Sequence, residues 1–323
     1  LAPSEMCIRD RNTVAQGDTR EVGLDQMVDS GFTITRAVQS RSWPSQNANL
    51  EFAAVWGTRN AVSSQATMIC DDESVPHISS LLEPAGRVEG RPERLADNAR
   101  LAFIGCYVLG KGFVLDPEGA RGWIKEEPRN VEVLFPYLNG GDLNSRPDCS
   151  ASRWVVDFNE RSQEEAMRYE LPWRYLFNEV RLERLSKNAE KYPRMVNEWW
   201  KFYNTRPAMR KAIASLNEVL VVAQTSNTLM PARVSARQVL SHMLVVFAEE
   251  SFVFQAVLSS SIHQSWVVRY GASMRGDSRY IPSDVFDTFP RPEPTPELEA
   301  IGRTLDTERR EIMLRRDLGL TKL

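Results

Sequence analysis

Basic residues recur along the chain at spacings that suit the binding of phosphates. Arg181, Arg184 and Lys187 occur every three residues, so a helix would place all three cations on one face, where they could contact a run of nucleic-acid phosphates. Glu179 and Glu183 lie beside them, and an ordinary solvated helix face therefore remains the alternative. We predict a phosphate-binding helix face at this position.

Two further groups of basic residues have a composition that suits binding to DNA. One begins at an expected helix start, and the other surrounds Gly271 and Gly276. A loop arginine beside a flexible glycine can enter a groove, where bidentate binding of guanine is the commonest specific contact. The predicted contact residues are Arg206, Arg210 and Lys211 in the first of these groups, and Arg269, Arg275, Arg279 and Tyr280 in the second.

Trp43 offers an aromatic face on an expected turn. It lies within residues 42–45, between two stretches of alternating polarity. An enzyme that modifies a base inside a duplex flips that base out and stacks it between aromatic or apolar side chains. Trp43 is therefore a candidate for stacking on a flipped base, and the alternative is a tryptophan that closes the end of a hairpin.

Motifs that would make a self-contained active site are missing from the sequence. It contains no glycine-rich dinucleotide loop after a strand, no phosphate-binding loop, no Gly-x-Ser-x-Gly elbow and no His-Glu-x-x-His zinc motif. His77, His242 and His263 lie far apart, and we expect each to be structural. The four cysteines are too widely spaced for a Cys-x-x-Cys metal site. The sequence thus predicts no catalytic residues and no metal site within these 323 residues.

Charge is distributed unevenly, although the net charge is only −3. Between Arg168 and Arg237, thirteen lysines and arginines stand against six glutamates, a local balance of +7. Aromatic residues lie among these charges, which suits phosphates and base faces. The 42 % apolar content is that of a globular protein. Because no apolar stretch is long enough to cross a bilayer, we expect a cytoplasmic protein without a membrane partner.

Periodicity predicts an α+β fold. Residues 19–31 are expected to form a helix that Thr19 caps and Gly31 ends, and residues 32–58 an antiparallel hairpin at a sheet edge. Ser162 and Glu165 form a potential capping box. Further strands are expected at 101–109, 131–138, 153–158, 219–223 and 239–247, further helices at 173–188, 193–203, 207–216, 251–270 and 296–316, and a proline-rich loop at 281–294.

Several short phrases along the chain resemble one known family. The N-terminal phrases NTVAQGDTR, GFTI, SWP and AAVW (residues 12–56) resemble the end of the catalytic domain of large single-chain DNA adenine methylases of restriction–modification systems, the MmeI-like type IIG/IIL enzymes. The later phrases YLNGGDL, RWVVDF, WWKF, LSSSIH and FDTFP (residues 137–290) resemble the target-recognition domain of that family. Each phrase is weak alone, and their order along the chain makes the resemblance specific.

The resemblance implies a class I methyltransferase with S-adenosylmethionine as donor, adenine N6 as acceptor and double-stranded DNA as partner. The glycine-rich donor loop and the Asn-Pro-Pro motif of the family occur nowhere in the sequence, so we expect a fragment that does not methylate by itself. The implied fold is α+β, with the C-terminal remnant of a methyltransferase sheet (a helix plus an antiparallel hairpin), then a mixed α/β target-recognition domain and a C-terminal helix. The alternative is a stand-alone DNA-specificity subunit without catalytic activity.

The resemblance also divides the chain. Residues 1–11 are expected to be an unrelated, adapter-like segment. The expected parts that follow are the end of the methyltransferase domain at 12–75, a connector at 76–100, the DNA target-recognition domain at 101–294 and a C-terminal helix at 295–323.

Overall fold

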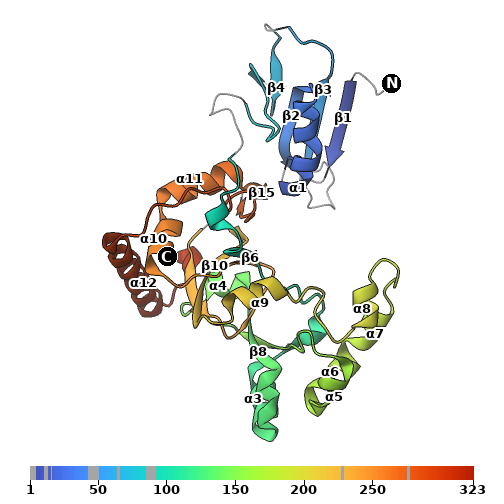
Figure 1. Ribbon diagram of the computed structural model, residues 1–323, viewed down its shortest axis with the longest axis vertical. Helices are drawn as coiled ribbons and strands as arrows, with labels where there is room; N and C mark the ends of the chain where they lie inside the picture. Colours follow the sequence, from blue (N-terminus) through green and yellow to red (C-terminus); the bar gives the residue numbers. More distant parts are fainter. Residues whose placement is uncertain are drawn as a thin grey trace. The chain divides into compact units, whose positions relative to one another are not determined.

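The chain forms two compact units in a computed structural model (Figure 1). The structure describes residues 5–10, 14–15, 17–42, 51–63, 66–84, 92–226, 229–274 and 277–323. Unit 1 comprises Leu1–Arg94 with Val267–Thr288, and unit 2 comprises Leu95–Trp266 with Phe289–Leu323. Each unit is described below by itself.

A five-stranded sheet forms the body of unit 1, in the order β1-β3-β2-β4-β5. Strands β2 (Thr33–Ser42) and β3 (Glu51–Thr58) pair antiparallel, with two register shifts, which confirms the hairpin predicted over residues 32–58. The remaining strands are β1 (Glu5–Asp10), β4 (Met68–Cys70) and β5 (Glu73–Val75). Apolar side chains of the hairpin, including Phe32, Ile34 and Val55, are buried in one core cluster.

The hairpin lies inside the sheet, so the expectation that it forms an edge is wrong. β1 pairs antiparallel with β3, and β4 pairs parallel with β2. The backbone of residues 5–10 therefore belongs to the sheet, although residues 1–11 were expected to stand apart from the fold. The physical reason is that an edge strand exposes unpaired N–H and C=O groups, which bind an adjacent extended segment.

The helical segment before the hairpin begins earlier than predicted. It consists of α1 (Gly17–Arg20), the π-helical turn η1 (Glu21–Asp25) and α2 (Gln26–Asp29). Thr19 lies within α1, so its predicted role as an N-cap is wrong. Gly31 has a φ of +89°, and this left-handed conformation after the last turn agrees with its predicted place at the helix end.

Two four-stranded sheets make the centre of unit 2. The first has the order β12-β10-β14-β6 and the second β13-β8-β9-β7. Their strands are β6 (Ala102–Ile104), β7 (Val114–Leu115), β8 (Leu134–Leu138), β9 (Arg153–Val156), β10 (Glu218–Ala223), β12 (Ala232–Ser235), β13 (Val239–Leu240) and β14 (Leu244–Phe247). The single strand predicted at 239–247 is two strands, because a turn at Ser241 carries the chain from one sheet to the other.

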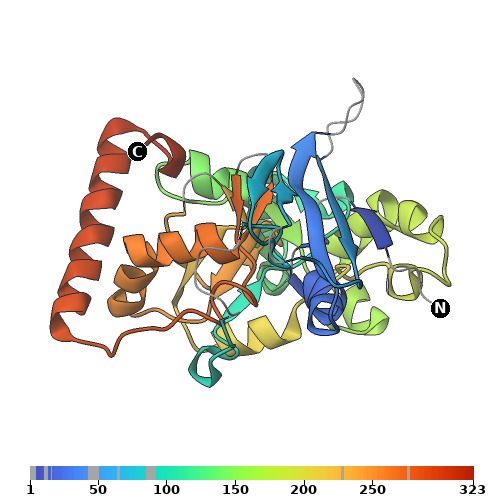
Figure 2. The ribbon, with the colours of Figure 1, turned by 90° about the horizontal axis from the view of Figure 1, so that it is seen from above.

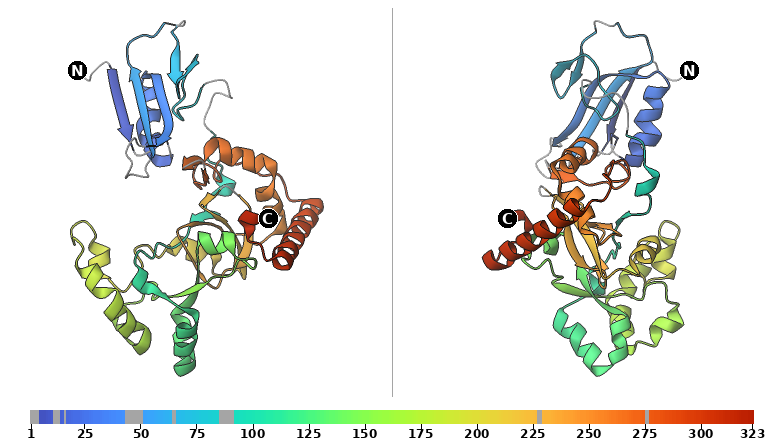
Figure 3. Two further views of the ribbon diagram at one scale, coloured as in Figure 1. Left: turned by 180° about the vertical axis from the view of Figure 1, so that it is seen from behind. Right: turned by 60° about the vertical axis from the view of Figure 1, so that its left-hand side comes forward.

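Helices project from these sheets in unit 2. Helix α3 projects separately from the group α5–α8, as the views in Figures 1 and 3 agree. Ser162 and Glu165 form the predicted capping box at the start of α5. The helix predicted at 173–188 is broken at Val180 into α6 and α7. The bounds are α3 (Pro117–Glu126), α4 (Gly140–Ser145), α5 (Gln163–Met167), α6 (Glu170–Glu179), α7 (Arg181–Leu185), α8 (Pro193–Asn197) and α9 (Pro207–Ile213).

The predicted C-terminal helix is confirmed as α12 (Pro296–Arg316), which Thr295 caps. It runs beside α10 (Phe252–Ser259), as Figure 2 shows. A buried carboxylate joins the two helices, because Asp306 accepts 2.8 Å hydrogen bonds from Gln255 Nε2 and from Arg309. Polar contacts of this kind fix the register of a helix pair in a way that apolar packing alone does not.

The segment after α10 completes the chain's regular structure. The helix predicted at 251–270 is broken at Ser260, and its second part is α11 (Ser261–Tyr270). Strands β15 (Ala272–Met274) and β16 (Asp277–Arg279) then pair antiparallel. Residues 280–295 form turns and loop, in agreement with the proline-rich loop predicted there.

Candidate nucleic-acid interface

One of the three cations predicted to share a helix face, Arg184, is buried in the core. Arg184 is 1 % exposed, and its guanidinium donates to the carbonyls of Val108 and Leu109 at 3.0 and 2.7 Å. Burial lowers the pKa of Arg184 to about 10. The prediction that Arg184 contacts phosphate is therefore wrong, because this side chain holds residues 108–109 in place.

The other two residues of this group remain at the surface. The guanidinium of Arg181 lies over the ring of Phe177, 4.6 Å from its centroid, and no carboxylate pairs with it among the described residues. Lys187 pairs with Glu183 at 3.6 Å, as the solvated-face alternative implied. Of the three predicted cations, Arg181 alone keeps a partly exposed charge without an acidic partner in the described part of the chain.

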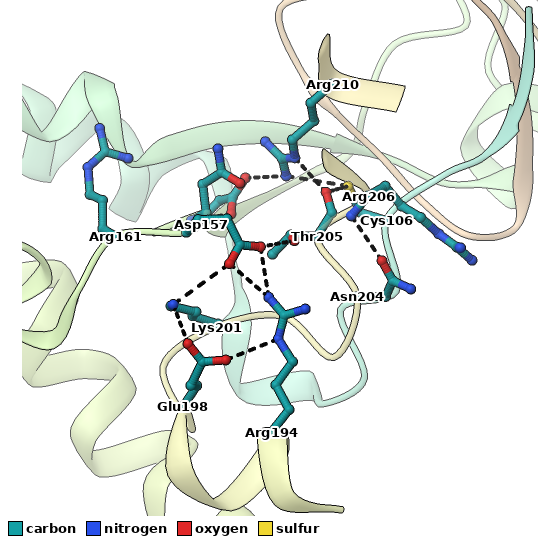
Figure 4. A network of polar contacts seen from close by, with 12 residues as sticks. Cys106, Asp157, Arg161, Arg194, Glu198, Lys201, Asn204, Thr205, Arg206 and Arg210 are labelled. Atoms are coloured by element: carbon teal, nitrogen blue, oxygen red, sulfur yellow. Dashed lines mark hydrogen bonds and ion pairs between the residues drawn. The ribbon is translucent and has the colours of Figure 1, made fainter. Parts of the chain in front are cut away.

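Arg210, from the second predicted group, forms a buried ion pair (Figure 4). Its guanidinium lies 2.6 Å from Asp157 Oδ2, and Asp157 is 1 % exposed. Arg210 also donates to the carbonyl of Thr205 at 2.7 Å and to Cys106 Sγ at 3.3 Å. Burial acts to lower the pKa of Arg210, and the Asp157 carboxylate and Cys106 thiol raise it above its ordinary value. The geometry assigns Arg210 to the scaffold, contrary to its predicted role in binding DNA.

A second polar cluster continues from this pair along the start of α8 and the loop that follows. Glu160 accepts hydrogen bonds from Arg194 and from the hydroxyl of Thr205, and Lys201 bridges Glu160 and Glu198. Arg194, Glu198, Lys201 and Thr205 point toward one another in Figure 4. Asp157 and Glu160 lie outside residues 168–237 and pair with cations of this basic stretch, so the local excess of +7 overstates the charge available to a ligand.

Two residues of the second group face away from this network. Arg206 donates through Nε to the carbonyl of Gly105 at 3.2 Å, and its two terminal amino groups have no partner among the residues that the structure describes. Figure 4 shows its guanidinium pointing away from Asp157 and Glu198. Lys211, in the last turn of α9, is exposed and has no ion-pair partner in the described ranges.

Three chain segments meet next to Arg206. Tyr107 and Asn204 exchange two backbone hydrogen bonds, at 2.9 and 3.1 Å, and His242 N donates to the carbonyl of Cys106 at 2.8 Å. Only glycine fits at position 105, because a Cβ there would lie 2.2 Å from the carbonyl oxygen of Ser241. We call residues 105–107, 203–206 and 241–243 the three-segment junction.

The three-segment junction presents an aromatic cluster that sequence reasoning missed. The ring of Tyr107 lies 4.1 Å from that of His242 and 5.4 Å, edge to face, from that of Tyr203. Tyr203 and Met243 are 36 % and 44 % exposed. Burial, together with the positive charge of Arg206, lowers the pKa of His242. These residues are distant in sequence, and no spacing rule brings them together.

The third predicted group and Trp43 are only partly described. Trp43 and Arg275 lie outside the described residues. Arg269 donates to the hydroxyl of Tyr270 at 3.1 Å, and Nε of Arg279 is buried. Tyr280 is 0 % exposed, which contradicts its predicted contact with DNA, because a fully enclosed ring offers no surface to a duplex.

Histidines and acids do not assemble into a catalytic or metal-binding cluster in the described ranges. No group of three potential ligands is found there that could hold a metal ion. His263 is 2 % exposed, its Nδ1 lies 2.8 Å from the carbonyl of Leu258, and burial lowers its pKa to about 4. Among the described helices, none is long and apolar enough to span a bilayer.

Arg206 and the aromatic side chains of the three-segment junction lie outside the helices and strands, on connecting segments, which is where binding residues concentrate in proteins. The family model of the MmeI target recognition domain matches residues 84–293, and the chain belongs to that family.

One solved structure has the same fold. The type IIL restriction–modification enzyme MmeI in complex with DNA is similar with a TM-score of 0.68 and 16 % identity, over 97 % of this chain and 42 % of that one. The type IIG restriction endonuclease BpuSI has a TM-score of 0.38 and 11 % identity, over 95 % of this chain and 42 % of that one. The chain thus spans less than half the length of either enzyme. No curated protein sequence matches it.

Proposed function

We propose that the chain binds double-stranded DNA as the target-recognition part of an MmeI-like restriction–modification enzyme. The match of residues 84–293 to the MmeI target recognition domain carries this proposal. The fold shared with an MmeI structure that was solved with DNA supports it. The chain's own contribution would be to select the DNA site.

Cations of unit 2 that stay at least partly exposed support binding to the DNA backbone. Arg181, Arg206 and Lys211 keep their charge without a carboxylate partner in the described part of the chain. Each cation that neutralises a phosphate releases condensed counterions, and this release dominates the affinity of proteins for duplex DNA. An overall charge of −3 is compatible with such binding because contacts depend on the local surface.

For the whole protein we propose methylation of adenine N6 with S-adenosylmethionine as the donor. In the described part of unit 1, however, only the pair β2 and β4 is parallel, whereas nucleotide-type cofactors bind at the carboxyl ends of parallel strands. The residues present therefore do not form a donor site, and we derive no methyl-transfer step from this chain. Tritiated S-adenosylmethionine and mixed duplex DNA should yield no labelled adenine with this chain alone.

A salt series tests the binding proposal. Fluorescence anisotropy with mixed-sequence duplexes should show affinity that falls steeply with salt, with about −0.9 in the log–log slope for each phosphate contacted. Lys211→Ala should weaken binding to all duplexes alike and reduce the slope by about 1.

Lys187→Ala is the matched control, because Glu183 already neutralises that lysine. Its salt slope should equal that of the wild type. A folded preparation that does not bind duplexes, or binds them independently of salt, would contradict the proposed function.

A further inference from the structure

The guanidinium of Arg206 is held in a fixed orientation before any ligand binds. Its backbone adopts the left-handed conformation, with φ of 56°, and its N–H donates to Asn204 Oδ1 at 3.0 Å. Nε then donates to the carbonyl of Gly105 at 3.2 Å. The residue is thus held at its main-chain N–H and at Nε, and a main-chain carbonyl orients the guanidinium plane.

This anchoring leaves the end of the guanidinium open for a planar ligand. With Nε engaged, the two terminal amino groups form a fork that can donate two parallel hydrogen bonds. Arg210, four residues later, directs a terminal amino group to Asp157 at 2.6 Å and has no such fork free. The flexible ammonium of Lys211 is a point charge, which neutralises a phosphate but cannot make a planar bidentate contact.

The surroundings of Arg206 are rigid as well. Hydrogen bonds between main-chain groups join the three-segment junction, and the rings of Tyr107 and His242 stack with an interplanar angle of 34°. Gly105 packs directly against the carbonyl of Ser241, so this carbonyl contact leaves little room for the loop to move. A recognition residue on a preorganised support loses less entropy on binding and discriminates better between ligands.

We propose that Arg206 is a specificity-determining residue that donates two hydrogen bonds to O6 and N7 of one guanine in the major groove of the DNA site. Guanine is the base whose major-groove edge presents two adjacent acceptors to such a fork. The inference rests on the proposed function, since it needs a DNA partner. It specifies which residue contacts the DNA, which base it recognises and in which groove.

Selection of duplexes from a pool with a randomised centre is the first test. The wild-type chain should enrich a site with an invariant G·C pair, and Arg206→Ala should lose preference at that pair by about 5- to 150-fold. Arg206→Lys keeps the charge and loses the fork, so it should keep the general affinity and lose the same preference. Because Ala and Lys at this position carry the same backbone strain as Arg, circular dichroism and thermal melting should show both variants folded.

Replacement of the selected guanine by 7-deazaguanine is the second test. This base pairs normally but lacks the N7 acceptor, so it should weaken wild-type binding and leave the binding of Arg206→Ala unchanged. Lys211→Ala should respond to the modified base as the wild type does. Unchanged discrimination in both Arg206 variants, or equal sensitivity of all proteins to 7-deazaguanine, would overturn the inference and leave DNA binding intact. Absence of DNA binding by the wild type would overturn the proposed function together with the inference.

Discussion

Replacement of Arg210 by alanine separates a role in stability from a role in DNA binding. The substitution removes the partner of Asp157, whose carboxylate is 1 % exposed and 2.6 Å from the guanidinium. It also leaves the carbonyl of Thr205 without its 2.7 Å donor. Lys211 is the adjacent residue, is exposed, and provides the matched control.

The expected loss follows from the burial of the carboxylate. Breaking a buried ion pair by removing one partner costs about 3–5 kcal/mol. The Arg210 side chain is 24 % exposed, and solvent screens part of the interaction, so we expect about 3 kcal/mol, at the lower end of that range. For a unit of this size each kcal/mol lowers the melting temperature by about 2–4 °C, which gives a decrease of about 6–12 °C. Lys211→Ala should change stability by less than about 0.5 kcal/mol.

Tryptophan fluorescence provides the assay. Trp43 and Trp56 lie in unit 1, so six of the eight tryptophans report on unit 2. Asp157→Asn introduced into the Arg210→Ala chain should recover part of the lost stability, because it removes the unpaired buried charge. Equal melting temperatures for Arg210→Ala and Lys211→Ala would refute the assignment of Arg210 to the scaffold.

Two further predictions concern the stability of unit 2. The pKa of His263 falls from about 6.5 to about 4 on folding, so the unfolded chain binds more protons between these values and stability should decline as pH falls through this window, by up to about 3 kcal/mol. Urea unfolding at several pH values should show that the free energy of unfolding falls more steeply with decreasing pH in the wild type than in His263→Asn. Identical pH profiles for the two proteins would contradict this prediction. Gly105→Ala should destabilise by about 3 kcal/mol or more, because its Cβ would lie 2.2 Å from a carbonyl oxygen. Gly122→Ala, on helix α3 with nothing within 4 Å, should instead stabilise slightly, and thermal melts that fail to separate the two variants would disprove the close contact.

Local signals predicted the elements that depend on a few neighbouring residues. Pro296 marks the start of α12, Ser162 and Glu165 form a capping box, and Gly31 ends the first helical segment. Each of these features is decided within one turn of chain. The breaks at Val180 and Ser260 were not predicted, although the second is local as well, because the hydroxyl of Ser260 accepts a 3.2 Å hydrogen bond from His263 N at the start of α11.

The basic composition of the candidate site could be predicted from the sequence, but the roles of its individual residues could not. Arg181, Arg184 and Lys187 have the same spacing and charge, yet burial against residues 108–109 removes Arg184 from the surface. The partner of Arg210, Asp157, lies 53 residues away. Such long-range contacts decide whether a cation belongs to the scaffold or to a binding surface, and a single sequence does not encode them in any spacing.

The main-chain hydrogen bonds of the three-segment junction have a consequence for sequence divergence. Main-chain groups of residues 106–107, 204 and 242 make these bonds, and the side chains of Tyr203 and Arg206 take no part in them. Substitution of these outward residues therefore leaves the supporting bonds in place. Related chains can vary at these positions without rebuilding the fold, so the surface can diverge faster than the scaffold beneath it.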